Sequence, residues 1–328
     1  MKIGPLSLEN NLFLAPLQNV STAPFRRFCR HYSEIGLVFV PMIYVRRLVK
    51  NQRSIEKEFH KIEEESPIAI QLIGNEPDYF KKALIILESY NFDAIDINAG
   101  CSSVRSLKFK LGGYLLREQK LLKEILRTTV KYSSWPVSLK TRIGFNKILD
   151  IDKFSQMINH SGINFLTLHA RKVKDNFERE KLDLDVLKLI KSKLDIPLIG
   201  NGDIDSPESA QFMVESIGVD GIMIGRACMG NPLIFNQISQ FMKNREIIKI
   251  EKTLQKMKEY VEDFNLILNS YVEDLPLNYS KDKFKFTELK RNAIWFTRQI
   301  PNSKKYRIEL SNTRNLSQLH NLLDSFFK

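Results

Sequence analysis

A cysteine stands directly after a short apolar run, in the stretch Asp96-Ile97-Asn98-Ala99-Gly100-Cys101. A buried strand that ends at a glycine-containing turn presents the next side chain at the carboxyl edge of a parallel sheet, where α/β proteins keep their chemistry. A thiol at that edge can act as a nucleophile, a metal ligand or a proton donor. No cluster of metal ligands and no oxyanion-hole pattern accompanies Cys101, so the proton-donor role is favoured and no metal is expected.

Polar side chains also stand at the ends of other apolar runs. Lys140 closes the run 137–140, and a cation in such a run is costly to bury without an anionic partner. A reduced flavin carries negative charge near its N1 atom, so Lys140 suits a flavin. Gln71 offers a donor and an acceptor to the uracil-like edge of that ring, and His169 is placed to reach its phosphate or its ring.

Two glycine-containing turns follow the last two apolar runs. Asn201-Gly202-Asp203 comes after the seventh run, and Gly225-Arg226 comes after the eighth. Barrels often bind phosphate between the loops after strands seven and eight, where glycine allows close backbone approach. The two turns together predict a phosphorylated cofactor, with Arg226 supplying charge.

The elements that must position these residues alternate along the chain. Amphipathic segments at 77–90, 120–132, 151–160, 184–193 and 207–215 separate most of the apolar runs, which predicts parallel strands joined by helices. Eight strands close a (β/α)8 TIM barrel, and no G-x-G-x-x-G fingerprint of an open dinucleotide-binding sheet follows the first. The eight predicted strands are residues 12–17, 37–42, 68–73, 94–97, 137–140, 165–169, 196–199 and 221–224.

The pattern changes after Met242, where strand-like runs cease. Residues 251–270, 284–300 and 315–327 are predicted to be helices, with breaks at 274–278 and 300–303. We therefore predict a catalytic flavin-binding barrel over residues 1–242 and a basic α-helical domain that binds nucleic acid over residues 243–328.

Positive charge is concentrated in the last part of the chain. The 328 residues carry a net charge of +12, and residues 279–328 hold eleven lysines and arginines against four acids. A basic surplus in one segment favours a nucleic-acid partner.

Composition excludes several other classes of protein. Three cysteines far apart in sequence and no C-x-x-C pair argue against a disulfide framework and a zinc site. No apolar run approaches the roughly 20 residues that span a bilayer, and no signal peptide is recognised at Met1. We expect a cytoplasmic protein that acts as a monomer and has no membrane partner.

The ordered motifs resemble those of the dihydrouridine synthases, and of their bacterial B-type subgroup in particular. The resemblance runs from residue 10 to the C-terminus and includes the helical segment. The motifs that carry it are Leu14-Ala15-Pro16, Pro24-Phe25-Arg26, Ile70-Gln71-Leu72, Asp96-Ile97-Asn98-Ala99-Gly100-Cys101, Lys140-Thr141-Arg142, Leu168-His169-Ala170-Arg171, Asn201-Gly202-Asp203-Ile204, Gly225-Arg226-Ala227-Cys228-Met229-Gly230-Asn231-Pro232 and Glu288-Leu289-Lys290-Arg291-Asn292-Ala293-Ile294-Trp295-Phe296.

This resemblance implies an FMN enzyme that reduces the C5–C6 double bond of uridine in RNA, usually tRNA, with NADPH as the source of hydride. It implies that Cys101 protonates C5 while the flavin N5 atom gives hydride to C6. The residues that it assigns to FMN are Pro16, Leu17, Gln18, Gln71, Lys140, His169, Asn201, Gly202, Asp203, Gly225 and Arg226.

Further polar residues are expected to contact the substrate RNA, and three other functions stay open. Ribosomal RNA is an alternative substrate, a flavin barrel acting on a small molecule is an alternative enzyme, and a barrel that only binds RNA is an alternative class. The expected RNA contacts are Asn98, Arg142, Arg105, Lys108, Lys110, Arg171, Lys290, Arg291 and Arg298.

Overall fold

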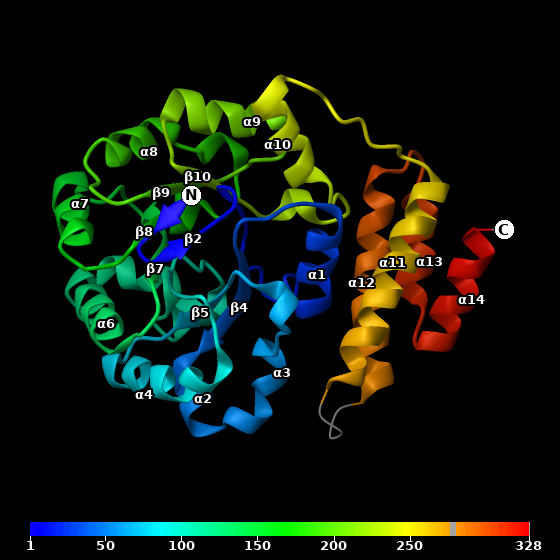
Figure 1. Ribbon diagram of the computed structural model, residues 1–328, viewed down its shortest axis with the longest axis horizontal. Coiled ribbons are helices and arrows are strands. Elements are labelled where there is room, and N and C mark those ends of the chain that lie inside the picture. Colours follow the sequence, from blue (N-terminus) through cyan, green and yellow to red (C-terminus); the bar gives the residue numbers. More distant parts are fainter. Residues whose placement is uncertain (276–279, 328) are drawn as a thin grey trace. The chain divides into compact units, whose positions relative to one another are not determined.

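Eight parallel strands form a ring (Figure 1). The computed structural model describes residues 1–275 and 280–327. The strands pair in the order β3-β10-β9-β8-β7-β6-β5-β4, and a parallel bridge between Phe13 and Leu37 joins the two ends of the sheet. Their bounds are β3 (Leu12–Leu14), β4 (Val38–Tyr44), β5 (Ile68–Ile73), β6 (Ala94–Ala99), β7 (Val137–Gly144), β8 (Phe165–Lys172), β9 (Leu198–Asn201) and β10 (Gly221–Ile224).

The predicted TIM barrel is confirmed, because each of the eight apolar runs overlaps one strand of the ring. The first run is strand only as far as Leu14. Pro16 lies just beyond it and has no backbone N–H to give to a strand ladder. Strand β6 continues to Ala99, two residues beyond the predicted end, so that Asn98 is part of the sheet.

Helices follow most strands and cover the outside of the ring (Figure 1). Four of them begin at side-chain caps: Ser103, Asp150, Asp183 and Ser206 each accept a backbone N–H of the first turn, at 3.1, 3.1, 3.0 and 3.2 Å. The helices of this part are α2 (Val45–Lys50), α3 (Glu56–Phe59), α4 (Pro77–Leu87), α5 (Val104–Lys108), α6 (Gln119–Tyr132), α7 (Ile151–Asn159), α8 (Leu184–Lys191) and α9 (Pro207–Gln211).

The interior of the barrel changes from apolar to polar along the strands. Near the amino ends, Phe13, Phe165 and Met223 pack with a hairpin of β1 (Lys2–Ile3) and β2 (Leu6–Ser7). Successive residues of a strand point to opposite faces, so the side chain two positions later faces the same way. Two positions after Ala69, Ala94, Phe165 and Ile199 of this apolar cluster come Gln71, Asp96, Thr167 and Asn201. The polar site is therefore at the carboxyl ends.

The chain forms two compact units: residues 1–22 with 35–225, and residues 23–34 with 226–328. Helix α1 (Ala23–Tyr32) belongs to the second unit, because Phe28 packs edge-on against Tyr260 and Phe264 at 5.8 and 5.5 Å between ring centroids. This grouping differs from a cut after residue 242, and the separate roles that we assigned to 1–242 and 243–328 stay a prediction.

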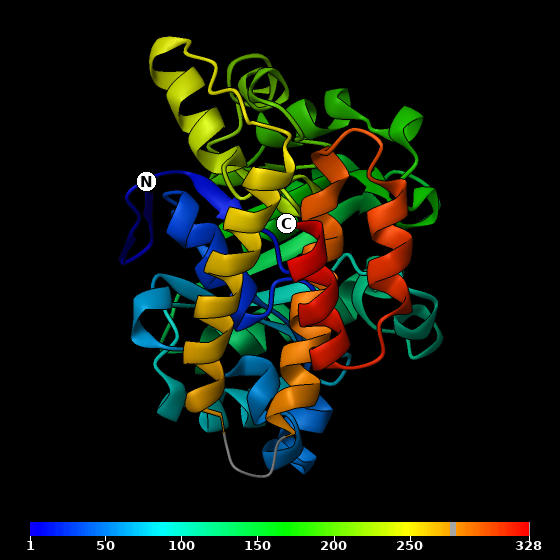
Figure 2. The same cartoon turned by 90° about the vertical axis from the view of Figure 1, so that its right-hand side faces the viewer.

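The second unit is helical, as predicted. In Figure 2 the four helices coloured gold to red lie side by side, and α12 packs against the other three. Helices α10 and α13 were not predicted, and part of the predicted break at 274–278 lies outside the described residues. No helix in the described part of the chain is long and apolar enough to cross a membrane. The helices are α10 (Ile234–Asn244), α11 (Leu254–Glu273), α12 (Lys281–Phe296), α13 (Lys304–Asn312) and α14 (Leu316–Phe326).

Candidate active site

Three neighbouring strands contribute a buried carboxylate and two partners at the carboxyl half of the barrel. Asp96 on β6 is paired in register with Gln71 on β5 and with Ser138 on β7. Its Oδ2 accepts a hydrogen bond from Nε2 of Gln71, and its Oδ1 accepts one from Oγ of Ser138, both at 2.6 Å. Asp96 is fully buried, so these bonds replace the water that a carboxylate would otherwise need.

A chain of amides connects this carboxylate with the cysteine turn. Nδ2 of Asn98 donates to Oε1 of Gln71 at 2.8 Å. Oδ1 of Asn98 accepts from the backbone N–H groups of Gly100 and Cys101, at 3.1 and 2.9 Å. The side chain of Asn98 therefore shapes the turn after β6 that presents Cys101.

Cys101 is partly exposed at the turn after β6. Its Sγ lies 3.4 Å from Oγ of Ser103 and 3.2 Å from Oγ of Ser106, on a segment that begins α5. Gly112 passes close to it with φ +58°, and a Cβ added there would come within 2.8 Å of the Cys101 Cβ. Glycine is thus required at 112, both for the left-handed backbone and for this approach.

The other two cysteines are fully buried. Cys29 lies in α1, and Cys228 lies in the turn Arg226–Cys228. Among the three, Cys101 alone is placed to meet a ligand from solvent.

Lys140 is the cation of the polar layer. Its Nζ donates to Oδ1 of Asn201 at 3.0 Å, and Nδ2 of Asn201 donates to the backbone oxygen of Met223 at 2.7 Å. Burial lowers the pKa of Lys140 to about 8, and the charge of Asp96 opposes this shift. Burial likewise raises the pKa of Asp96 to about 6, against the hydrogen bonds from Ser138 and Gln71 and the charge of Lys140. Each charge therefore helps the other to persist near neutral pH.

Arg142 connects the cysteine turn with the loop after β8. Its Nε donates to the backbone oxygen of Gly100 at 3.1 Å, and its Nη1 donates to those of Lys172 and Asn176 at 3.0 and 2.8 Å. The guanidinium also lies 5.2 Å from the centroid of the exposed Phe177 ring. Burial, with a smaller effect of Arg171, lowers the pKa of Arg142 to about 10, so the side chain stays cationic at neutral pH.

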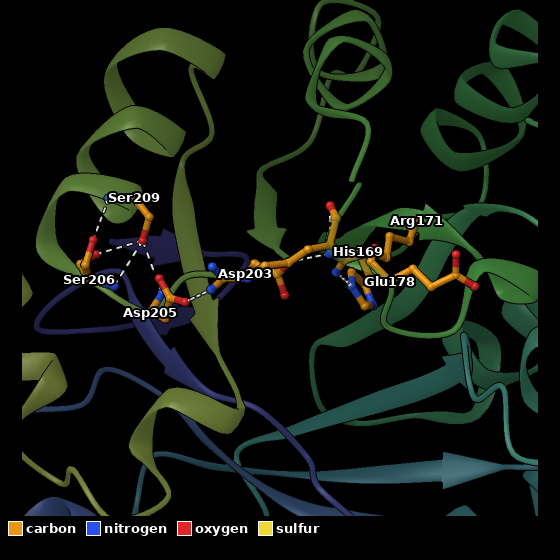
Figure 3. Close-up of polar contacts among 8 residues, drawn as sticks. His169, Arg171, Glu178, Asp203, Asp205, Ser206 and Ser209 are labelled. Carbon is orange, nitrogen blue, oxygen red and sulfur yellow. Dashed lines mark hydrogen bonds and ion pairs between the residues drawn. The ribbon is translucent and has the colours of Figure 1, made fainter. Parts of the chain in front are cut away.

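His169 is oriented by a buried arginine (Figure 3). Nη1 of Arg171 lies 3.2 Å from Nε2 of His169, and its Nη2 forms an ion pair with Asp203. A guanidinium only donates hydrogen bonds, so Nε2 of His169 must accept and the ring proton is on Nδ1. His169 is therefore a neutral imidazole that can donate from Nδ1.

Two ion pairs join the end of β8 and the loop after it to the loop after β9 (Figure 3). Arg171 pairs with Asp203, and Arg179 pairs with Asp205. The backbone N–H of Asp205 also donates to Oγ of Ser209 at 3.1 Å. These contacts fix the turn at Gly202, where φ is +129° and a Cβ would come within 2.6 Å of Leu182.

The Arg171–Asp203 pair gives a stability prediction. Replacing Arg171 by methionine is expected to lower the free energy of unfolding by about 3–5 kcal/mol, because Asp203 would lose a fully buried partner. Urea-induced unfolding measures this. The matched control is Arg179→Met, whose side chain is 70% exposed and whose loss should cost about 1 kcal/mol or less. Equal losses in the two variants would contradict the assignment.

The structure brings most of the residues assigned to FMN to one end of the barrel. Gln71, Lys140, His169 and Asn201 face its interior at the carboxyl half. A Cβ at Gly225 would touch Ala15 and Leu17 at 3.7 Å, so the end of β10 lies beside the segment after β3 that also holds Pro16 and Gln18. Arg226 opens the turn that follows Gly225 in the chain.

The residues expected to contact RNA separate into exposed and buried ones. Arg105, Lys108 and Lys110 are exposed on the segment after Cys101, as is Arg298 in the helical unit. Asn98 and Arg142 are buried at the site itself. Arg171 has no exposed surface and lies beside His169 and Asp203, and its contact with RNA stays a prediction.

Two expected RNA contacts of the helical unit have partners inside that unit. Nζ of Lys290 donates to the backbone oxygens of Ser311 and Thr313, each at 2.7 Å. Arg291 pairs with Glu288 at 3.1 Å. Lys290 therefore joins α12 to the end of α13, whereas the pair of Arg291 and Glu288 lies within α12.

Sequence reasoning missed Asp96, Ser138, Ser106 and Phe177. The signal for Asp96 was present, because an acid two positions before Asn98 in an apolar run must share its inward face. Ser138, also two positions before a predicted site residue, carried the same signal. Phe177 lies in a loop and Ser106 in the five-residue helix α5, and both segments are too short or irregular for periodicity to indicate the direction of a side chain.

A model of the dihydrouridine synthase family matches residues 13–328. The chain belongs to the dihydrouridine synthase family. Its relatives include tRNA-dihydrouridine synthase B of Pasteurella multocida, 34% identical over 287 residues that make up 86% of this chain and 82% of that protein. The same-named proteins of Vibrio parahaemolyticus and Pseudomonas aeruginosa are 36% and 29% identical, over 74% and 95% of this chain and 76% and 91% of theirs.

Solved structures support the fold of this family member. A mutant of morphinone reductase in complex with tetrahydroNAD superposes with a TM-score of 0.52 at 13% identity, over 76% of this chain and 91% of that one. At this identity the likeness shows the barrel fold alone. Among residues 1–275 and 280–327, no three His, Cys, Asp or Glu side chains are grouped to hold a metal ion.

Proposed function

We propose that the protein is a flavin-dependent tRNA-dihydrouridine synthase. The observation that carries the proposal is the partly exposed thiol of Cys101 at the end of β6, beside a polar layer that includes Asn98 and Lys140. The relatives named tRNA-dihydrouridine synthase B indicate tRNA as the substrate. We expect the reaction to take place in the cytoplasm.

The residues present fit an FMN cofactor. Lys140 offers an ammonium group for the anionic edge of the ring, and Gln71 retains one amide hydrogen beyond its bond to Asp96. Gly202 and Gly225 leave backbone free of side chains after β9 and β10, where barrels hold phosphate. When bound, FMN would supply hydride to C6 of the uracil ring, with NADPH as its source.

A residue of the chain supplies the proton that the uracil ring gains at C5 in this reaction. Adding hydride at C6 builds negative charge towards C5, and the thiol of Cys101 donates its proton there as a general acid. The resulting thiolate lies in the field of Lys140 and Arg142, both of which interact electrostatically with Cys101. These cations stabilise the thiolate until solvent returns the proton. The uridine must leave its stack to reach the site.

The direct test is to purify the protein and incubate it with NADPH and unmodified tRNA. We expect a yellow protein with bound FMN and formation of dihydrouridine, measured by mass spectrometry of nucleosides. A colourless protein that cannot be reconstituted with FMN would overturn the proposal. A parallel incubation with unmodified ribosomal RNA distinguishes the two RNA substrates, and flavin reduction by NADPH without any RNA turnover would favour a small-molecule enzyme.

Exposed cations of the helical unit are expected to bind the RNA backbone. Lys304, Lys305 and Arg314 are all exposed. Changing the three to glutamate should weaken tRNA binding. The logarithm of the association constant falls with the logarithm of the salt concentration, and this fall should become shallower by about 1 for each phosphate that the variant no longer neutralises. Filter binding at several salt concentrations measures this.

The matched control for that triple variant is on the barrel. Lys120, Arg127 and Lys131 are likewise exposed, along α6. Changing them to glutamate alters the net charge equally, and a comparable loss of salt dependence there would show that overall charge, not the helical unit, governs binding.

A further inference from the structure

A continuous hydrogen-bonded chain leads from the barrel interior to the cysteine turn. It starts at the carboxylate of Asp96, passes through the side-chain amides of Gln71 and Asn98, and ends at the backbone N–H of Cys101. Its three links measure 2.6, 2.8 and 2.9 Å. Asp96 and Gln71 are 0% and 1% exposed and Asn98 is 8% exposed, so water competes little for these bonds.

The two ends of the chain fix the direction of every bond between them. An ionised carboxylate only accepts hydrogen bonds, so Gln71 must turn its NH2 group towards Asp96 and its oxygen towards Asn98. Asn98 then turns its NH2 group towards Gln71 and its oxygen towards the turn. A backbone N–H only donates, so the far end requires the same direction. The charge of Asp96 and the shape of the turn at Cys101 are thereby connected.

The same carboxylate is the anionic partner of Lys140. Lys140 is the charged group whose field acts on Asp96, and Asp96 in turn favours the charged form of Lys140. Arg142, which also interacts with Lys140, has the opposite effect on it. A neutral residue at 96 would therefore leave Lys140 with a burial penalty and a cationic neighbour.

We propose that Asp96 is a positioning residue for the proposed reaction, which as an ionised carboxylate orients Gln71 and Asn98, shapes the turn that presents the Cys101 thiol, and maintains the cation of Lys140. Asp96 need not touch the substrate. The inference rests on the proposed function for its catalytic consequence, whereas its structural consequence at Cys101 can be measured without turnover.

The first experiment compares Asp96→Asn with the wild-type protein. Asparagine has the same shape and can still accept from Gln71 while donating to Ser138, so it removes the charge at little cost to packing. The pH profile of single-turnover dihydrouridine formation is expected to lose its acid limb near pH 6, which belongs to Asp96. The alkaline limb near pH 8, which belongs to Lys140, should move down by about 1 pH unit or more, the typical effect of an adjacent opposite charge.

The second measurement is alkylation of Cys101 by iodoacetamide, followed by peptide mass spectrometry. An asparagine at 96 replaces the charge-assisted hydrogen bond to Gln71 by a weaker neutral one, so the direction of the amide chain is then imposed from the cysteine turn alone. We expect Cys101 to be alkylated about fivefold faster, the factor that one typical hydrogen bond contributes. The buried Cys29 and Cys228 should stay unmodified, which reports that the protein remains folded.

Ser155→Ala is the control. Ser155 is buried on α7, outside the polar site, and its Oγ makes no hydrogen bond within the described part of the chain. Wild-type rates are expected for both measurements. If Asp96→Asn does not fold, Gln71→Met interrupts the same chain at its middle and should give the same rise in Cys101 alkylation.

Failure of the inference about Asp96 can be distinguished from failure of the proposed function. An Asp96→Asn protein with the pH profile and the alkylation rate of Ser155→Ala would overturn the inference and leave the proposed function intact. A wild-type protein that forms no dihydrouridine in any RNA would overturn the proposed function, and the alkylation rates would then still decide whether Asp96 shapes the cysteine turn.

Discussion

Replacing Cys101 by alanine is expected to lower the rate of dihydrouridine formation by about 10²–10⁴-fold, the usual contribution of a positioned general acid. The thiol is the partly exposed cysteine at the end of β6, and its turn is held by Asn98. FMN content should not change, because the groups assigned to the cofactor lie on other strands. Single-turnover assays on unmodified tRNA, with the absorbance of the flavin recorded in parallel, measure both quantities.

Two further variants make the cysteine experiment specific. Cys228→Ala removes a buried thiol far along the chain and should leave the rate constant within about twofold, as expected for a site without a role in proton transfer. Cys101→Ser keeps a hydroxyl near Ser103 and Ser106, but a hydroxyl is a much weaker acid than a thiol. The rate of dihydrouridine formation in this variant should therefore be close to that of the alanine variant. An unchanged rate in Cys101→Ala would remove the thiol from the mechanism.

Replacing Lys140 by methionine is expected to lower both FMN retention and the reduction rate, the latter by about 10²–10³-fold, as for the loss of a preorganised charge in a site. The ammonium group is held by Asn201 at 3.0 Å and has no substitute in the methionine variant. Loss of its field should raise the pKa of Asp96 further, so that this carboxyl group takes up a proton at neutral pH. Ultrafiltration of the flavin and single-turnover kinetics measure the two effects.

Two further variants separate the effect of the positive charge at position 140 on flavin binding from the effect of the exact place of the ammonium group. Lys140→Arg keeps a cation and should retain part of the flavin binding that Lys140→Met loses. Lys147→Met, on the exposed hairpin that follows the same strand, is the surface control and should behave as the wild-type protein does. Full FMN binding and full activity in Lys140→Met would show that the cation is not needed by the cofactor.

Sequence reasoning located the barrel because its signals are local. Each apolar run of strand length was bounded by turn residues, and the amphipathic segments between runs had the spacing of helices. The same periodicity placed Cys101 and Lys140 at strand ends, and an anionic partner for Lys140 was required on physical grounds. The sequence indicated a reduced flavin as that partner but not Asp96, because Asp96 and Lys140 are separated by more than forty residues and meet only when β6 pairs with β7.

What the sequence determined by itself was the barrel with its helical segment, the motifs of a dihydrouridine synthase, and the positions of the thiol and the glycine turns at strand ends. Only the tertiary structure decided that Asp96 is linked to Cys101 through Gln71 and Asn98, that Arg171 is buried against Asp203, and that α1 packs with helices over 200 residues away. The physical reason is that periodicity reports which face a side chain occupies, whereas the choice of hydrogen-bond partner depends on strand register and loop geometry that only the folded chain establishes.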